Sequence, residues 1–307
     1  MPPKTSVSNT RIDEIFSIYK LATKPTIRRI TVGFTNEIHQ VDNYIIKIYV
    51  RPDGEKSFDI ESAFYKNLYG EVMVPKLVVA DKSQKLIGKP FIIYKIIQGE
   101  PLGNTWHTLT DSERKNIIRA VCEQIKLIRE TESKPQLEAG ETWQQQIVST
   151  IGQSLELVHN EHLLSEQTIA YITEFVETYQ NTLGKQVLAL TYWDVHLDNI
   201  IVNKQHNLTG LIDFEHVDVV SIDYLLNNIR RLVRYPHLTL SPEMEDKANA
   251  ADYEHLMEWF EEYYPELFDF PELERRIDLY ELADVLRQLP RFPKAQQLHD
   301  RISSILQ

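Results

Sequence analysis

The sequence is short of cysteine, of positive charge and of long apolar runs. Its 307 residues include one cysteine, Cys122, which excludes an intrachain disulfide and a thiolate metal site made by this chain alone. The 33 Lys and Arg residues are outnumbered by 45 Asp and Glu residues, and the formal charge of −12 argues against general nucleic-acid binding and against an anionic membrane surface. No stretch approaches the roughly 18 apolar residues of a membrane-spanning helix, and no signal-peptide core is evident at the N-terminus. These features fit a cytoplasmic protein.

The composition and the charge distribution are more informative. A chain of this length has room for about two domains, and 42% hydrophobic residues can build a sizeable core. Residues 1–99 contain 15 basic and 10 acidic residues, whereas residues 241–285 contain 3 basic and 15 acidic ones. The acidic stretch is typical of solvated helix faces, but it would also suit a cationic ligand. Charge alone leaves both interpretations open.

Periodicity predicts a β-rich beginning and a helical remainder. After a short helix over residues 10–22, two β-branched runs in residues 27–50 flank a turn at Asp42 and Asn43, which predicts a hairpin. A helical pattern from Phe58 ends at Gly70, and two further strands follow within residues 74–97. Helical patterns then dominate, with one β-rich island at residues 187–216; they cover residues 110–132, 140–160, 165–183, 221–233, 243–263 and 271–289. We therefore expect an α+β fold with an N-terminal lobe (1–97), a linker (98–103) and a helical lobe (104–307).

The β-rich island contains an ordered set of acids and amides. Asp194 follows a strand-like run, Asn199 precedes a second run, and Asp213 ends a third. If the second and third runs form a hairpin, Asn199 and Asp213 lie close together at one end of it. Amide and carboxylate oxygens suit Mg²⁺, which takes few protein ligands and keeps water and phosphate oxygens. Asp194 would then be free to accept a proton from a hydroxyl group.

These segments resemble those of a known enzyme family. YWDVHLDN at residues 192–199 and IDFE at residues 212–215 are similar to the H-G-D-x-H-x-x-N and I-D-F/W segments of aminoglycoside phosphotransferases and choline kinases. Tyr192 and Trp193 stand where those proteins have His and Gly. The resemblance implies a bilobal protein-kinase-like fold and Mg²⁺-dependent phosphoryl transfer from ATP or GTP to a hydroxyl group. It makes Asp194 the catalytic base, and Asn199 and Asp213 the metal ligands.

The resemblance extends to the N-terminal lobe. A strand-borne lysine in this family contacts the nucleotide phosphates and pairs with a helical glutamate, roles that fall to Lys47 and Glu61. Burying Lys47 in the apolar run YIIKIYV without an acidic partner would be costly, and Glu55 is an alternative partner that we expect in a loop. The remaining predicted nucleotide-binding residues are Gly33 and Thr35 in a phosphate-covering loop, Lys95 and Ile97 in the interlobe hinge, and Ile212.

The acceptor is expected to bind in the helical lobe, where acidic residues suit a small cationic molecule. The candidates are Asp198, Glu215, Asp218, Glu258 and Glu262. An aminoglycoside is the first expectation, with a role in antibiotic resistance; a choline, ethanolamine or other small-metabolite kinase is the second, because Trp259, Tyr263 and Tyr264 would suit a quaternary ammonium. The same aromatic residues are also typical of a helix core. A non-catalytic nucleotide-binding protein is a third interpretation, which the complete Asp194–Asn199–Asp213 set argues against. No A-P-E segment follows Asp213, which disfavours a protein kinase.

Overall fold

The computed structural model describes residues 6–30, 36–131, 142–240 and 244–307. The chain forms two compact parts, the first made of residues 1–128, 196–217 and 236–252 and the second of residues 129–195, 218–235 and 253–307. A β-rich N-terminal region and a mostly helical C-terminal region confirm the expected α+β class. The first compact part extends beyond residue 97 and includes most of α3 (Asp111–Glu130). The lobe boundaries drawn from the sequence therefore remain a prediction.

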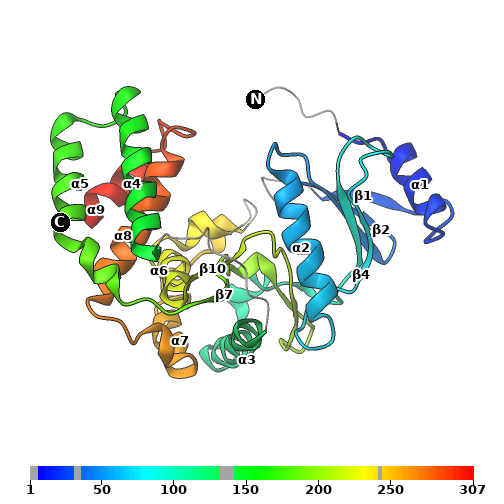
Figure 1. The fold of residues 1–307 in the computed structure, drawn as a ribbon. Helices are drawn as coiled ribbons and strands as arrows, with labels where there is room; N and C mark the ends of the chain where they lie inside the picture. Colours follow the sequence, from blue (N-terminus) through cyan, green and yellow to red (C-terminus); the bar gives the residue numbers. More distant parts are fainter. Residues whose placement is uncertain (1–5, 31–35, 132–141, 241–243) are drawn as a thin grey trace. The chain divides into compact units, whose positions relative to one another are not determined.

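The first part contains a five-stranded antiparallel sheet (Figure 1). Its strands lie in the order β1 (Ile27–Ile30), β2 (Glu37–Val41), β3 (Tyr44–Ile48), β5 (Phe91–Lys95) and β4 (Leu77–Asp81). The predicted turn at Asp42 and Asn43 is confirmed, since Val41 pairs with Tyr44 and Asp42 takes a left-handed φ of 51°. The first β-branched run holds two strands, β1 and β2, where the sequence pattern indicated one. Residues 31–35 between them lie outside the described residues.

Alternation along β3 directs its side chains to two different helices. Ile46 and Ile48 join Phe16 of α1 (Asn9–Ile18) in one core cluster. Lys47 lies between them in sequence and therefore faces the other side of the sheet, where α2 (Gly54–Leu68) packs against β4 and β5. Helix α2 begins four residues before the expected start at Phe58, so Glu55 lies in its first turn and not in a loop.

A second, three-stranded sheet in the first part is flanked by the metal-ligand candidates, since Asn199 directly precedes β8 and Asp213 follows β9 by two residues. It consists of β6 (Glu100–Pro101), β8 (Ile200–Val202) and β9 (Leu208–Leu211). The predicted hairpin of β8 and β9 is confirmed, with Ile200 opposite Leu211. Cys122 lies on the buried face of α3 with Ile118, Val121 and Ile125, and burial raises the pKa of its thiol to about 12. Cys122 is therefore a core residue that stays protonated at neutral pH.

The second part is mainly helical. Its described residues form a two-stranded sheet of β7 (Leu188–Tyr192) and β10 (Val217–Ser221). They also form the helices α4 (Trp143–Asn160), α5 (Glu166–Tyr179), α6 (Leu225–Arg234), α7 (Leu256–Tyr263), α8 (Leu273–Gln288) and α9 (Gln296–Ile305). The predicted helix over 243–263 is wrong in its first half, where short 3-10 turns precede α7. Strand β10 and helix α9 were not expected from the sequence pattern.

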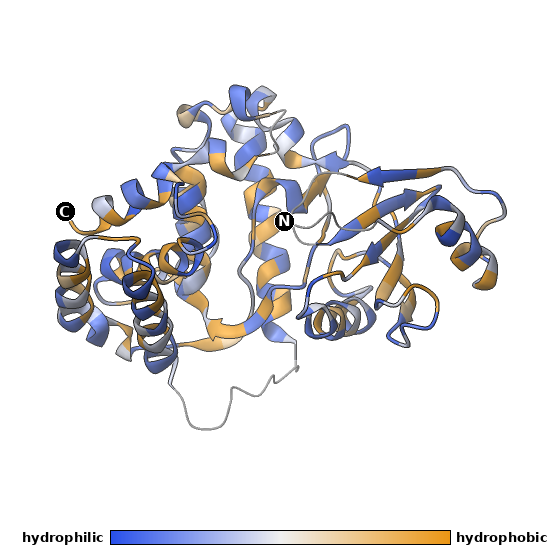
Figure 2. Cartoon of the chain, turned by 90° about the horizontal axis from the view of Figure 1, so that it is seen from above, coloured by the Kyte–Doolittle hydropathy of each residue, from blue (hydrophilic) through white to orange (hydrophobic). Residues whose placement is uncertain are grey.

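The helices carry apolar residues along part of their surface and polar residues elsewhere (Figure 2). In the part of the chain that the structure describes, no helix combines the length and the hydropathy that crossing a membrane requires. The apolar residues instead form the cores of the two parts. In the second part, one large cluster joins residues of α4, α5, α8 and α9.

Candidate active site

Lys47 is the centre of a buried charge cluster in the first part. Its Nζ donates to Glu61 Oε2 at 2.6 Å and to Asp213 Oδ1 at 2.6 Å, and it lies 3.6 Å from Glu215 Oε2. The Lys47 side chain is 3% exposed and that of Glu61 is fully buried. The predicted Lys47–Glu61 ion pair is therefore confirmed, whereas Glu55 bonds to Gln84 on the protein surface. The pair arises because β3 directs Lys47 toward the helix that carries Glu61.

Two tyrosines hold Glu61 in place. Tyr49 donates to Oε2 at 2.7 Å, and Tyr65 donates to Oε1 at 2.8 Å. Tyr49 follows Lys47 by two positions and shares its side of the sheet, while Tyr65 follows Glu61 by four positions and shares its helix face. Both spacings can be read from the sequence, but neither tyrosine was predicted. With Lys47, they satisfy a carboxylate that would be costly to bury alone.

Asp213 has an unusual backbone conformation. Its φ is +64°, a left-handed value that is uncommon outside glycine and occurs at functional positions. The backbone N–H of Asp213 donates to the Tyr65 hydroxyl at 3.3 Å. The next residue, Phe214, is fully buried and stacks on Phe64 with ring centroids 4.2 Å apart. Helix α2 thus contacts Asp213 through one hydrogen bond and the next residue through one stacked ring.

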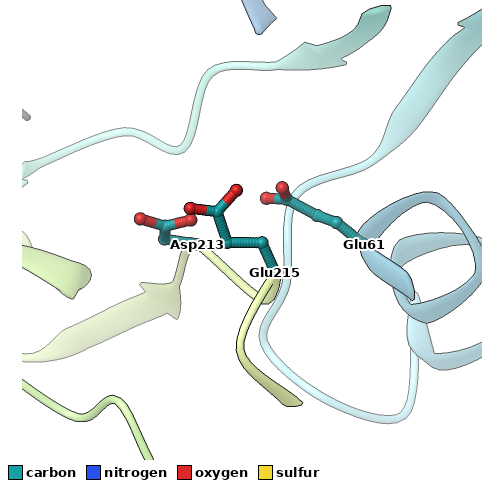
Figure 3. Close-up of side chains that lie close together, drawn as sticks. All are labelled: Glu61, Asp213 and Glu215. Carbon is teal, nitrogen blue, oxygen red and sulfur yellow. The ribbon is translucent and has the colours of Figure 1, made fainter. Parts of the chain in front are cut away.

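Three carboxylates surround the single ammonium group. Figure 3 shows those of Glu61, Asp213 and Glu215 directed toward one another, Glu61 from a helix and the other two from one loop. Their oxygens lie within 4.8 Å of one another. Burial alone would lower the pKa of Lys47, but attraction by the three acids outweighs it and keeps that pKa well above its usual value. The formal charge of the cluster is two units negative.

This excess of negative charge changes the titration of the acids themselves. Burial raises the pKa of Glu61 above its usual value, and the charge of Asp213 adds to that effect. Burial would also raise the pKa of Asp213, but the Lys47 ammonium outweighs it and holds that pKa below the usual value. Asp213 is the acid that meets solvent, since 33% of its side chain is exposed. It is ionised and reachable at neutral pH.

The donor set fits a divalent cation of the Mg²⁺ type. Hard carboxylate oxygens that outnumber the one ammonium group suit such an ion. Asn199 belongs to the same region, because its backbone carbonyl accepts from the Ile212 N–H at 3.0 Å. This bond adjoins the Ile200–Leu211 pair of the β8–β9 hairpin. Glu215 is 5% exposed and accepts from Asn36 Nδ2 at 2.6 Å. Asp213 and Asn199 would hold the ion, with Glu215 as a further carboxylate.

Asp194 lies in the second part, two residues beyond the end of β7. The amide of Asn228 on α6 donates to the Trp193 carbonyl at 2.6 Å and contacts Asp194 Oδ1 at 3.4 Å. Asn228 was not among the predicted residues, because 34 positions separate the two side chains in the chain. No local spacing indicated this contact.

The other predicted nucleotide-binding residues have varied surroundings. Gly33 and Thr35 lie outside the described residues. The Lys95 N–H donates to the Lys76 carbonyl at 2.9 Å, so a purine contact by that N–H would compete with this bond. The Ile97 side chain packs so closely on Gly210 that a Cβ at position 210 would lie 2.4 Å from it. Their nucleotide contacts, and that of Ile212, stay predictions.

The acidic acceptor candidates differ in their exposure and in their partners. Asp218, Glu258 and Glu262 are exposed, and Glu258 bonds to His255 Nδ1 at 3.1 Å. Asp198 is partly buried in the first part, and burial raises its pKa despite the nearby His196. Glu215 belongs to the Lys47 cluster instead of a separate acid surface.

Two of the three aromatic candidates are core residues. Trp259 is 7% exposed and Tyr264 is 1% exposed. Their rings therefore offer little surface to a quaternary ammonium ligand in this structure. The core interpretation of this helix, which the sequence left open, agrees with their burial.

Comparison with known proteins identifies the family. The model of a phosphotransferase enzyme family matches residues 26–224, well over half of the chain. The chain belongs to this phosphotransferase family. The match includes Lys47, Glu61, Asp194, Asn199 and Asp213, and it confirms the family and the enzyme class expected from the sequence. A search of curated proteins found no match.

Solved structures of aminoglycoside phosphotransferases share the fold of this phosphotransferase. ADP-bound APH(2'')-Ib is 17% identical, with a TM-score of 0.68 over 98% of this chain and 97% of that chain. APH(4)-Ia is 16% identical, with a TM-score of 0.69 over 97% and 98%. The GDP and kanamycin complex of APH(2")-IIia is 17% identical, with a TM-score of 0.69 over 97% of each chain. At these identities the likeness establishes the fold.

Proposed function

We propose that this phosphotransferase transfers the γ-phosphoryl group of ATP or GTP to a hydroxyl group of a small cationic molecule in the cytoplasm. The observation that carries the proposal is the buried Lys47 ammonium, held between Glu61 and Asp213 at 2.6 Å from each. A fixed cation beside an exposed carboxylate suits a nucleotide phosphate and its metal ion. The nucleotides in complexes of similar fold, ADP and GDP, support the same class of donor.

Each residue has a defined task in the proposed reaction. Lys47, oriented by Glu61, binds the α- and β-phosphates. Asn199 and Asp213 hold Mg²⁺, which offsets negative charge on the phosphate oxygens when it is bound. Asp194 orients the acceptor hydroxyl and takes its proton. The acceptor oxygen forms a bond to the γ-phosphorus, the bond from that phosphorus to the bridging oxygen breaks, and the nucleoside diphosphate leaves with that electron pair.

An aminoglycoside is the acceptor class that we favour, which would give the protein a role in antibiotic resistance. Residues 241–285 combine 15 acidic with 3 basic residues, and Glu258 and Glu262 are exposed among them. The exposed carboxylates of this stretch attract polycationic molecules. The gentamicin, kanamycin and hygromycin B complexes of proteins with this fold agree with that class.

The first experiment measures diphosphate release from Mg-ATP and Mg-GTP with a panel of acceptors. The panel contains aminoglycosides, choline, ethanolamine and a macrolide, and mass spectrometry identifies the phosphorylated product. We expect turnover with at least one aminoglycoside. Turnover with choline or ethanolamine alone would show that the acceptor is a small amino alcohol and not an aminoglycoside. Nucleotide binding without any turnover would favour a non-catalytic protein.

Two variants separate the proposed roles. Asp194→Asn keeps the shape of the side chain and removes the base, so kcat should fall at least ~10³-fold while Mg-ATP affinity stays within about threefold. Asp213→Asn should weaken Mg-dependent nucleotide binding instead, measured by calorimetry with and without Mg²⁺. Undiminished turnover by Asp194→Asn would refute the assignment of the base, and equal Mg-ATP affinity in Asp213→Asn would refute the metal role.

A further inference from the structure

A buried amide on α6 contacts the segment that carries the proposed base. Asn228 is 3% exposed, and its Nδ2 donates to the Trp193 carbonyl at 2.6 Å and to Asp194 Oδ1 at 3.4 Å. We infer that Asn228 is a positioning residue for Asp194, holding both the peptide before it and one oxygen of its carboxylate. This inference rests on the proposed role of Asp194 as the base.

The placement of Asn228 is unusual for a helix core. Helix α6 buries Leu225, Leu226, Ile229 and Leu232 around it. An amide among such residues lowers stability unless its hydrogen bonds are made. The Asn228 amide donates to residues 193 and 194. The amide is therefore aimed at the base-carrying segment.

The Trp193 side chain anchors the same segment from another direction. Its ring meets that of Tyr224 edge-on, with centroids 5.4 Å apart, and Tyr224 in turn contacts Trp143 at 5.3 Å and Tyr280 at 5.1 Å. A glycine at this position could not make this contact. In this chain the peptide before Asp194 is thus held by an aromatic cluster at its side chain and by Asn228 at its carbonyl.

Such positioning has a direct consequence for catalysis. A base works only within hydrogen-bond reach of the proton that it takes, and a misplacement of about 1 Å costs on the order of 10²-fold in rate. A bond to Oδ1 together with a bond to the preceding carbonyl restrains rotation of the carboxylate, and with it the direction of its other oxygen. Loss of the amide should therefore lower kcat more than it changes either KM.

The helix offers a matched control. Asn227 is 4% exposed, and its Nδ2 donates to Asp284 Oδ2 at 3.0 Å, so Asn227→Ala also removes a buried amide and one hydrogen bond to a carboxylate. We expect Asn228→Ala to lower kcat by about 10–100-fold, with both KM values within about threefold. Asn227→Ala should keep kcat within about threefold of the parent at a similar loss of thermal stability.

A second variant separates hydrogen bonding from packing. Asn228→Asp keeps the size of the side chain but replaces the donor with an acceptor next to a carbonyl and a carboxylate. If Asn228 positions Asp194, this variant should be at least as slow as Asn228→Ala; if it only fills space, Asn228→Asp should be the faster of the two. Equal kcat in Asn228→Ala and Asn227→Ala would also overturn the inference.

The outcomes distinguish this inference from the proposed function. Full activity of Asp194→Asn would refute the base itself, whatever the Asn228 variants do. Crystal structures of Asn228→Ala and Asn227→Ala test the inference without an activity measurement, through the position of the Asp194 carboxylate. The Asp194 carboxylate should be displaced or rotated in the first and unchanged in the second, and an unmoved carboxylate in Asn228→Ala would overturn the inference.

Discussion

At the residue scale, Tyr65 is the side chain that joins two predicted functional groups. One hydroxyl donates to Glu61 Oε1 at 2.8 Å and accepts from the Asp213 N–H at 3.3 Å. It thereby links the partner of Lys47 to a residue held at a φ of +64°. A left-handed non-glycine residue persists only when its surroundings support it.

Tyr65→Phe should weaken both functions of this hydroxyl. The Asp213 N–H loses its partner, and a buried carboxylate loses one of three donors, so we expect a loss of stability of about 1–3 kcal/mol. The affinity for Mg-ATP, measured by calorimetry, should fall by about five- to tenfold. Tyr49→Phe is the control, since it removes a donor from Glu61, whereas among the described residues the Asp213 N–H bonds to Tyr65 and not to Tyr49. Equal Mg-ATP affinities in the two variants would contradict a role of Tyr65 at Asp213.

At the element scale, α4 begins with a complete capping box. Thr142 accepts from the Gln145 N–H at 3.2 Å, and the Gln145 side chain accepts from the Thr142 N–H at 2.8 Å. These bonds satisfy two backbone donors, one in the first turn and one at the N-cap itself. The helix then supplies Trp143, Ile147 and Ile151 to the core of the second part. The capping box therefore stabilises the first turn of a helix that contributes to this core.

Thr142→Ala should lower the free energy of unfolding by about 1 kcal/mol, measured by urea denaturation. Thr173→Ala on α5 is the matched control. Thr173 is exposed within its helix and donates only to the Ile169 carbonyl, so alanine should be neutral or slightly stabilising there. A Thr142→Ala variant as stable as Thr173→Ala would show that the cap contributes little.

At the scale of the whole molecule, buried charges of the second part are compensated in a network of ion pairs. Glu281 accepts from Arg230 Nη2 at 2.7 Å and from Arg301 Nε at 2.9 Å, and it is 2% exposed. Burial would raise the pKa of Glu281, but the two arginines outweigh it and hold that pKa below its usual value of 4.5. The stabilisation is therefore complete above pH 4.5 and is lost as the pH falls through the lower folded-state pKa.

Glu281→Gln should lower the free energy of unfolding by about 3–5 kcal/mol at pH 7, because two buried arginines lose their charged partner. Its stability should also fall less steeply than that of the parent below pH 4.5, as followed by urea denaturation across pH. Glu274→Gln is the control on the same helix, since Glu274 lies 3.4 Å from Arg230 but is 68% exposed; it should change stability by less than about 0.5 kcal/mol. Parallel pH curves for the parent and Glu281→Gln would contradict this account.

Much of the site was predictable because its evidence is local. Lys47 in an apolar strand needed an acid, and the helical pattern that follows offered Glu61. The hairpin of β8 and β9 was predicted from two apolar runs around a polar turn, and it brings Asn199 next to Ile212. Tyr65 could also have been found, four residues after Glu61.

The sequence by itself determined the fold class, the family and the candidate residues, because periodicity and motif spacing depend on neighbours along the chain. Only the tertiary structure decided the contacts between residues that lie far apart in the sequence and carry no motif. Examples are the contact of Asn228 with Asp194 and the pairing of β10 with β7, which join segments with no preferred separation in sequence. The burial of eleven consecutive residues of α8, 276–286, also depends on elements packed around the helix. Such contacts follow from how whole elements pack, so their geometry becomes visible only after the chain has folded.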